Sequence, residues 1–183
     1  MCFDRLAPMA TMRNILGSLV ATIAILAVMS LAIWQPMMEL SGGLPILDTM
    51  ITYNYNDVVA LFTALGSEGR GLYSIQQIID MIFPIMYSVT LTLALILLAP
   101  NPVRKRKWAR IVVFLPLAGA AFDYAENILI ATQIAAFPSL SEAIIEIAAF
   151  VTWTKWVLLS FSFVLLLIFL VPALSPTKDR KQG

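Results

Sequence analysis

The chain of 183 residues has no histidine, and its only cysteine is Cys2. Without imidazole there is no haem ligation through histidine, there are few options for zinc or copper, and the usual general base near neutral pH is missing. A lone thiol forms no intrachain disulfide and supports no paired-cysteine redox chemistry. A metal would have to be held by carboxylate oxygens alone. We therefore predict a protein without a metal site or cofactor.

Charge is also scarce, since Asp, Glu, Lys and Arg together make up 13% of the chain, whereas 60% is hydrophobic. A soluble domain is about 45–50% apolar and about 25% charged, so this composition predicts an integral membrane protein. The net charge of +1 gives no bulk attraction to nucleic acid, and we predict none as a partner. No repeat or linker divides the sequence, which indicates a single membrane domain over residues 1–183.

Long apolar runs predict the fold. A helix needs about 20 apolar residues to cross a bilayer. The first run is longer than the ~7–15 apolar residues of a signal peptide, which indicates a retained helix. Pro84 and Pro116 lie inside the second and third runs and predict kinks. The sequence therefore predicts an all-α, four-helix transmembrane bundle with spans at about residues 14–34, 73–99, 111–137 and 142–171.

Basic residues near the span ends predict the orientation, because lysine and arginine concentrate in cytoplasmic loops. Of the links between spans, residues 35–72 and 138–141 together hold one basic residue, Arg70, beside several acidic ones. The other flanks are basic, which predicts a multi-pass protein of the inner (plasma) membrane with both termini cytoplasmic. These flanking residues are Arg5, Arg13, Arg104, Lys105, Arg106, Lys107, Arg110, Lys178, Arg180 and Lys181.

The outer segment, residues 35–72, is predicted to contain a short amphipathic helix. Asn56 or Asp57 is the expected N-cap, and Gly66 is the expected end after Leu65. The helix would lie on the membrane surface or cap the bundle. The glycine-rich link that follows is either a solvated turn or part of a lid over an outward-facing pocket. The apolar face comprises Val58, Val59, Leu61, Phe62 and Leu65.

Four charged residues, Asp80, Asp123, Glu126 and Lys155, interrupt the apolar runs. A charge at membrane depth costs roughly 2.5–3.5 kcal/mol on insertion scales, so it has to be paired, wetted or functional. At a rise of 1.5 Å per residue, Glu126 and Asp123 lie ~16 and ~21 Å from the outer end of the third span. Lys155 lies ~20 Å along the fourth span and is expected to reach one of them, whereas Asp80 lies ~10 Å along the second.

Counting charges suggests a site, because one lysine does not neutralise three carboxylates. At least one carboxyl is expected to be protonated or to face a wet cavity, an arrangement that suits proton transfer. Asn127 shares a helix face with Asp123 and Glu126, and Tyr87 shares one with Asp80. We predict that these residues bind a ligand, with Lys155 as the counter-ion. The alternative is that they join the helices structurally, beside a close-packing surface of Gly119, Ala120 and Ala121.

Three motifs carry a resemblance: Ala64-Leu65-Gly66-Ser67-Glu68-Gly69-Arg70, Asp80-x-x-Phe83-Pro84-x-x-Tyr87 and Phe122-Asp123-Tyr124-x-Glu126-Asn127. Over about residues 45–160 the chain resembles an uncharacterised group of bacterial four-span membrane proteins, which implies the same fold but brings no activity. In layout alone it is similar to the sterol isomerase and sigma-2 receptor superfamily, in which a four-span bundle has a long first outer loop and acidic residues in a pocket for lipophilic amines. No site residue is transferred from that likeness.

Two functions follow from these observations. The first is binding of a small lipophilic or amphipathic molecule within the membrane, with isomerase-type proton shuttling as a special case. The second is a non-catalytic accessory or assembly subunit whose polar face meets partner membrane subunits. Transport is disfavoured, since four spans enclose little pore and show no inverted repeat. The expected partners are membrane lipids with, respectively, a lipophilic small molecule or other membrane subunits.

Overall fold

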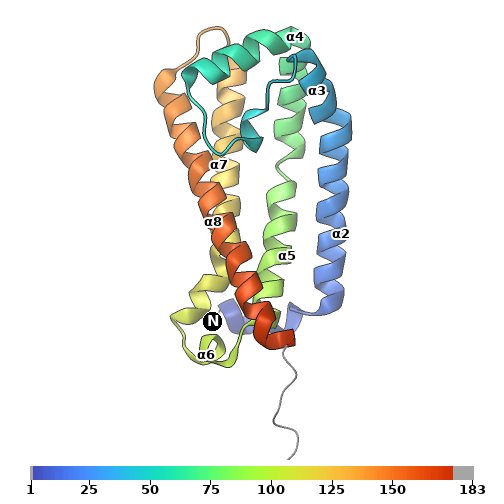
Figure 1. Ribbon diagram of the computed structural model, residues 1–183, viewed down its shortest axis with the longest axis vertical. Coiled ribbons are helices and arrows are strands. Elements are labelled where there is room, and N and C mark those ends of the chain that lie inside the picture. The colour runs from blue at the N-terminus through green and yellow to red at the C-terminus, as the bar shows by residue number, and fades with distance from the viewer. Residues whose placement is uncertain (1, 175–183) are drawn as a thin grey trace, which may run out of the picture.

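The computed structural model describes residues 2–174, and the predicted basic residues Lys178, Arg180 and Lys181 lie outside this range. The described chain is helical and contains no strand. Four helical stretches are long and apolar enough to cross a membrane: Met12–Leu40, Tyr55–Leu98, Ala109–Ala136 and Glu142–Leu174. The predicted all-α four-helix bundle is therefore confirmed (Figure 1). The first stretch is longer than predicted, because its helix continues past residue 34.

The first stretch consists of α2 (Met12–Met29), a π-helical turn η2 (Ser30–Trp34) and α3 (Gln35–Leu40). It follows a short N-terminal α1 (Cys2–Leu6) and the turn η1 (Ala7–Met9). The Thr11 side chain caps α2 by accepting a hydrogen bond from the Asn14 backbone N–H at 3.3 Å. π-helical turns are rare and usually single. η2 locally changes the helical register of this stretch where it contacts α4.

The second stretch contains α4 (Tyr55–Ile79) and α5 (Phe83–Leu98), separated by a break at residues 80–82. Within α4, Gly66 has φ +61° and ψ −167°, a combination that strongly favours glycine. The predicted end of the outer helix at Gly66 is thus observed as a sharp bend. The N-cap prediction was wrong by two or three residues: Asn54 caps α4, and Asp57 accepts the Asn54 N–H to complete a capping box.

The first part of α4 crosses the end of the bundle, and its continuation descends into it (Figure 1). Its apolar face packs inward against α7 and α8, with Val58, Leu61, Phe62 and Leu65 all 2% exposed or less. Of the two predicted positions, the outer helix therefore takes that of a cap on the bundle. Between α3 and α4 the chain also dips inward and forms the short turn η3 (Leu47–Thr49).

The third stretch begins with the turn η4 (Ala109–Phe114) and continues as α7 (Leu115–Ala136), and the fourth is α8 (Glu142–Leu174). The prediction that Pro84 and Pro116 kink the interiors of their helices was wrong. Each lies in the first turn of a new helix, where the missing N–H costs little. α7 packs along α8, whereas α2 packs on α5 rather than on α8. A Cβ added at Gly119 would lie 3.0 Å from Leu159 Cδ2, which shows how closely α7 approaches α8.

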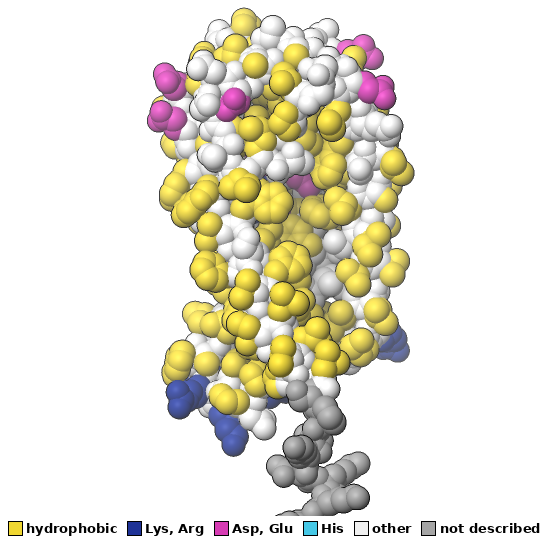
Figure 2. Space-filling view, in the orientation of Figure 1, with side chains coloured by type: hydrophobic (Ala, Val, Ile, Leu, Met, Phe, Trp, Pro, Cys, Tyr) yellow, Lys and Arg dark blue, Asp and Glu magenta, His cyan; other side chains and the backbone are white. Residues whose placement is uncertain are grey.

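The two ends of the bundle differ in charge. Lys and Arg side chains gather at the end that holds α6 (Asn101–Lys105), and most visible Asp and Glu side chains gather at the α4 end (Figure 2). At the basic end, Arg104 donates to the carbonyl oxygens of Ile96, Leu97 and Ala99, at 3.1, 2.9 and 2.7 Å, and so caps α5. Arg110 bonds Asp4 at 2.7 Å and fastens the N-terminal segment to the same end.

Candidate functional site

The centre of the site is Lys155 on α8, which contacts two carboxylates on α7. Its Nζ donates to Asp123 Oδ1 at 3.2 Å and also to Glu126 Oε2. The three side chains are 5%, 6% and 0% exposed, respectively. Asp123 and Glu126 are three residues apart and share one face of α7. The sequence predicted that Lys155 would reach one of these carboxylates, and the structure places it between both.

Two hydroxyl groups complete this cluster. Tyr87 of α5 donates to Asp123 Oδ2 at 2.9 Å, so both oxygens of Asp123 accept hydrogen bonds. The Thr152 hydroxyl, one turn before Lys155, lies 2.7 Å from Glu126 Oε1 and 3.3 Å from the Tyr53 hydroxyl. The carboxylates are thus held by donors from α5 and α8, and Tyr53 of the outer segment contacts the Thr152 hydroxyl. Such complete pairing is what allows charge to persist inside a membrane bundle.

Asp80 lies at the break between α4 and α5. Asn127 of α7 donates its side-chain N–H to Asp80 Oδ2 at 3.0 Å, and Tyr124 donates to the Met81 carbonyl oxygen at 2.7 Å. The break therefore exposes backbone carbonyls that α7 satisfies. Within the described chain, the Asp80 carboxylate accepts only this one hydrogen bond, from a neutral amide. It is the least compensated carboxylate of the site.

Asp48, one of the acidic residues that lie beside Arg70 in the outer links, belongs to the site. It lies in η3, is 8% exposed, and accepts hydrogen bonds from the Tyr73 hydroxyl at 2.6 Å and Gln77 Nε2 at 3.2 Å. The only sequence signal was its apolar surroundings, Leu44, Ile46, Leu47, Met50 and Ile51. Such neighbours favour a loop that folds inward. With Asp48, four carboxylates share a single lysine.

A cavity of about 460 Å³ lies beside these groups. Its walls come from α2 and α8 on either side and α5 between them, and Figure 2 shows the hollowed face, with acidic atoms visible inside it. Because α2 does not pack against α8, the cavity lies where two lipid-facing helices part. Its polar lining includes Thr22, Trp34, Asp48, Thr49, Asp80, Tyr87, Asp123 and Lys155. Its apolar lining includes Leu26, Met29, Phe83, Leu91, Leu159 and Phe163.

Of the six predicted site residues, Asp80, Tyr87, Asp123 and Lys155 line this cavity. Glu126 and Asn127 do not. They are fully buried behind the wall and hold Lys155 and Asp80 in place. Sequence reasoning also missed Trp34, which lines the cavity and whose buried indole Nε1 has no hydrogen-bond partner within residues 2–174. A buried donor without a partner leaves a position for a ligand or water acceptor.

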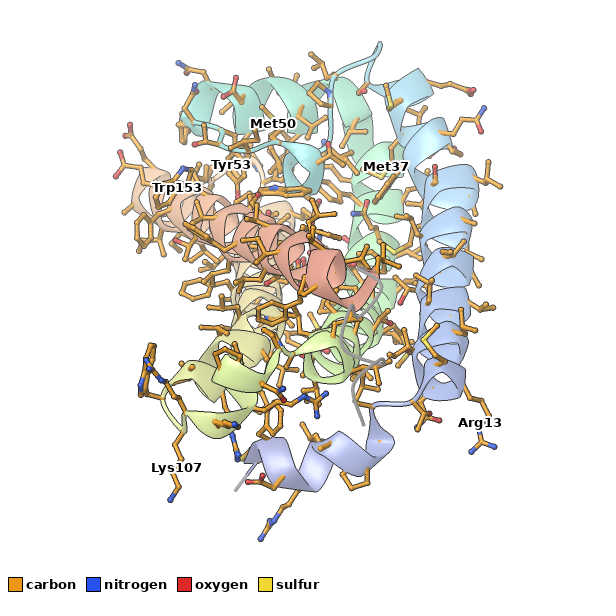
Figure 3. All side chains as sticks on the ribbon, turned by 60° about the horizontal axis from the view of Figure 1, so that its bottom comes forward. Arg13, Met37, Met50, Tyr53, Lys107 and Trp153 are labelled. Carbon is orange, nitrogen blue, oxygen red and sulfur yellow. The ribbon has the colours of Figure 1, made fainter. Side chains whose placement is uncertain are left out.

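A second hollow of about 610 Å³ opens at the α4 end, on the other side of the outer segment. Polar and acidic side chains line it, among them Asn54, Glu142 and Glu146. Tyr53 contributes to its wall and points toward α8 (Figure 3). Burial raises the pKa of the Tyr53 hydroxyl above its usual range, so this phenol stays neutral.

Within residues 2–174, no group of three or more Asp, Glu, Cys or His side chains is arranged to hold a metal ion. The fold and site together define a multi-pass helical membrane protein with an acidic cluster inside the bundle. Comparison with known proteins adds no relative, because no family model, curated protein or solved structure matches the chain.

Proposed function

We propose that this protein binds a small amphipathic molecule, which enters from the lipid through the gap between α2 and α8. The observation that carries the proposal is the lining of the cavity. Three carboxylates and Lys155 form part of its wall, and leucine, methionine and phenylalanine side chains form another part. A volume of about 460 Å³ is within the range of small-molecule sites. A ligand with a polar head and an apolar tail fits both parts.

Asp80 is the residue best suited to contact the head group. Asp48, Asp123 and Glu126 each accept two or more hydrogen bonds or an ion pair, whereas the Asp80 carboxylate accepts, from the described residues, only the Asn127 amide. A buried carboxylate gains most from a donor that carries positive charge. The head group is therefore proposed to be a protonated amine, with Lys155 as the internal counter-ion that stabilises Asp123.

We retain the orientation and the membrane location that were proposed from the sequence. We place the basic end in the cytoplasm and the α4 end outside the inner (plasma) membrane, because lysine and arginine mark the cytoplasmic side. The described N-terminus and the end of α8 both lie at the basic end (Figure 1). In this orientation the acidic cluster lies nearer the outer surface.

Isomerase-type chemistry is the catalytic form of the proposal. Carboxyl groups of unequal environment, such as Asp80 and Asp123, suit donation of a proton to one atom of a ligand and removal from another. The alternative function, an accessory subunit with a polar face for partner helices, receives less support. The buried charged side chains of α7 and α8, Asp123, Glu126 and Lys155, find their partners inside this chain, so they do not require groups from another subunit.

A matched series of probes tests the proposal. We would reconstitute the protein in nanodiscs and measure its thermal unfolding with octylamine, octanol or octanoate. The three probes share one tail and differ in head-group charge. Octylamine is expected to stabilise the protein most, by about 1.4 kcal/mol at ten times its Kd, because a ligand that binds only the folded state adds RT ln(1 + [L]/Kd).

The variant Asp80→Asn should lose the preference for octylamine, whereas Glu39→Gln, an exposed acidic residue on α3, should keep it. Lipid partitioning is the same for all variants and cancels in this comparison. Equal shifts for the three head groups in the wild type would refute the amine site. Co-purification of a stoichiometric membrane partner in mild detergent, combined with no probe effect, would favour the subunit function.

A further inference from the structure

An unbroken series of hydrogen-bonding side chains joins the inner cavity to the outer hollow at the α4 end. Tyr53 lines the outer hollow, and its hydroxyl lies 3.3 Å from Thr152 Oγ1, which lies 2.7 Å from Glu126 Oε1. Glu126 Oε2 contacts Lys155, Lys155 contacts Asp123 at 3.2 Å, and Tyr87 contacts Asp123 at 2.9 Å. Lys155, Asp123 and Tyr87 line the inner cavity.

We propose that this series is a proton relay between the water at the α4 end and the inner cavity. It deepens the proposed function, on which it rests for the role of the inner cavity. That cavity faces lipid, so bulk water is a poor proton source there. The outer hollow, by contrast, is open at the α4 end and is lined in part by exposed polar and acidic residues, among them Asn54, Glu142 and Glu146.

The transfer balances as a series of hops. Tyr53 takes a proton from water and gives its own hydroxyl proton to Thr152 Oγ1. Thr152 gives its hydroxyl proton to Glu126 Oε1, and rotation of the resulting carboxylic acid turns that proton toward Lys155. Lys155 gives one ammonium proton to Asp123 and takes one from Glu126. One proton has then moved from water to Asp123, and every intermediate group has regained its original protonation.

Each residue type suits its step. The raised pKa of Tyr53 keeps its phenol neutral, so it passes protons as a hydroxyl and not as a phenolate. The Thr152 hydroxyl accepts and donates at once, which valine, of the same shape, does not do.

Six titratable groups lie within electrostatic reach of Glu126 from every neighbouring element: Asp48 and Tyr53 of the outer segment, Tyr73 of α4, Tyr87 of α5, Asp123 of α7 and Lys155 of α8.

Trp156 supplies a built-in reporter. Lys155 Nζ lies 5.6 Å from the centre of the Trp156 ring, so the indole fluorescence responds to the charge of the cluster. We would replace Trp34, Trp108 and Trp153 by Phe, reconstitute the protein in nanodiscs, and follow Trp156 emission after a rapid jump from neutral to acidic pH. This three-tryptophan variant, with the relay residues unchanged, should show a fast change in Trp156 emission.

Thr152→Val and Tyr53→Phe should slow this change by about tenfold or more, since each removes one proton-passing hydroxyl and keeps the side-chain shape. Thr152→Ser should restore the fast rate. Thr154→Val on the same helix and Tyr55→Phe in the same outer hollow are matched controls and should remain fast, because neither hydroxyl belongs to the series. Using two interrupting variants keeps the test decisive if one of them does not fold.

Wild-type rates in both Thr152→Val and Tyr53→Phe would overturn the relay, and so would a Trp156 emission that ignores pH in the wild-type background. The octylamine shift, measured on Tyr53→Phe, separates the two proposals. A slow pH response with a normal octylamine shift supports both proposals. A slow response combined with no octylamine preference in any variant supports the relay and refutes the amine site.

Discussion

Asn127 on α7 donates its side-chain N–H to the Asp80 carboxylate at 3.0 Å, and this bond fastens the break between α4 and α5 to the neighbouring helix. Both residues are buried, at 0% and 4% exposed. A helix interrupted inside a membrane leaves backbone groups that neighbouring helices must satisfy. The break is therefore a built feature that turns Asp80 toward the cavity.

Replacement of Asn127 by Leu should destabilise the protein. The change leaves the Asp80 carboxylate without its hydrogen-bond donor, and an unsatisfied buried partner costs about 1–3 kcal/mol. The measurement is thermal unfolding in detergent. Ile128→Ala is the matched control on the adjacent, lipid-facing position, where the side chain is 56% exposed, and it should change stability little. A stable Asn127→Leu protein would show that Asp80 has another donor.

Removal of Lys155 alone should lower the free energy of unfolding more than removal of all three charges of the cluster. Lys155→Met leaves two buried carboxylates facing each other without a cation, and breaking a buried pair costs roughly 3–5 kcal/mol. Adding Asp123→Asn and Glu126→Gln to the same protein removes the uncompensated charge and should recover most of the stability. Thermal unfolding of the single and triple variants checks this. A triple variant no more stable than Lys155→Met would show that packing, and not charge, dominates.

Gly66 should tolerate no other residue without strain. Its φ of +61° with ψ of −167° is a conformation that side chains oppose, so Gly66→Ala is expected to cost about 1–3 kcal/mol. Gly17 in α2 is the control: it is helical and an added Cβ there meets nothing within 4 Å, so Gly17→Ala should be neutral or stabilising. Equal effects at the two positions would mean that the bend in α4 is not required.

The contact of Gly119 with Leu159 should be sensitive to volume. Gly119→Val places atoms where Leu159 already lies and is expected to cost about 1–3 kcal/mol by overpacking. Because the obstacle is a side chain, Leu159→Ala in the same protein should relieve part of this cost, a coupling that a double-mutant cycle in thermal stability measures. Additive effects of the two changes would refute direct contact.

Much of the fold was predictable from the sequence because membrane insertion depends on local composition. Four apolar runs predicted four spans, and Gly66 predicted an end of the outer helix, where the structure has a sharp bend within α4. The rise per residue placed Lys155 at the depth of Asp123 and Glu126, where the structure brings them together. The errors in position concern the residues at which helices begin, which depend on contacts with neighbouring elements. Asn54 is the cap of α4 and not Asn56 or Asp57, and the two prolines begin helices instead of kinking them.

The site itself was predictable only in part. Charge scarcity singled out Asp80, Asp123, Glu126 and Lys155, since any charge in an apolar run stands out. It did not single out Asp48, because a carboxylate in an outer loop looks ordinary until the loop folds between helices. Nor did it separate residues that line the cavity from Glu126 and Asn127, which lie behind its wall.

The sequence by itself determined the membrane class, the four spans and the depth of the buried charges, because hydrophobicity and helical rise act along the chain. Only the tertiary structure decided which charges pair, that the outer segment inserts Asp48, and that α2 parts from α8 to leave a cavity. These depend on how helices distant in sequence meet, and side-chain contacts between them have no counterpart in any local pattern.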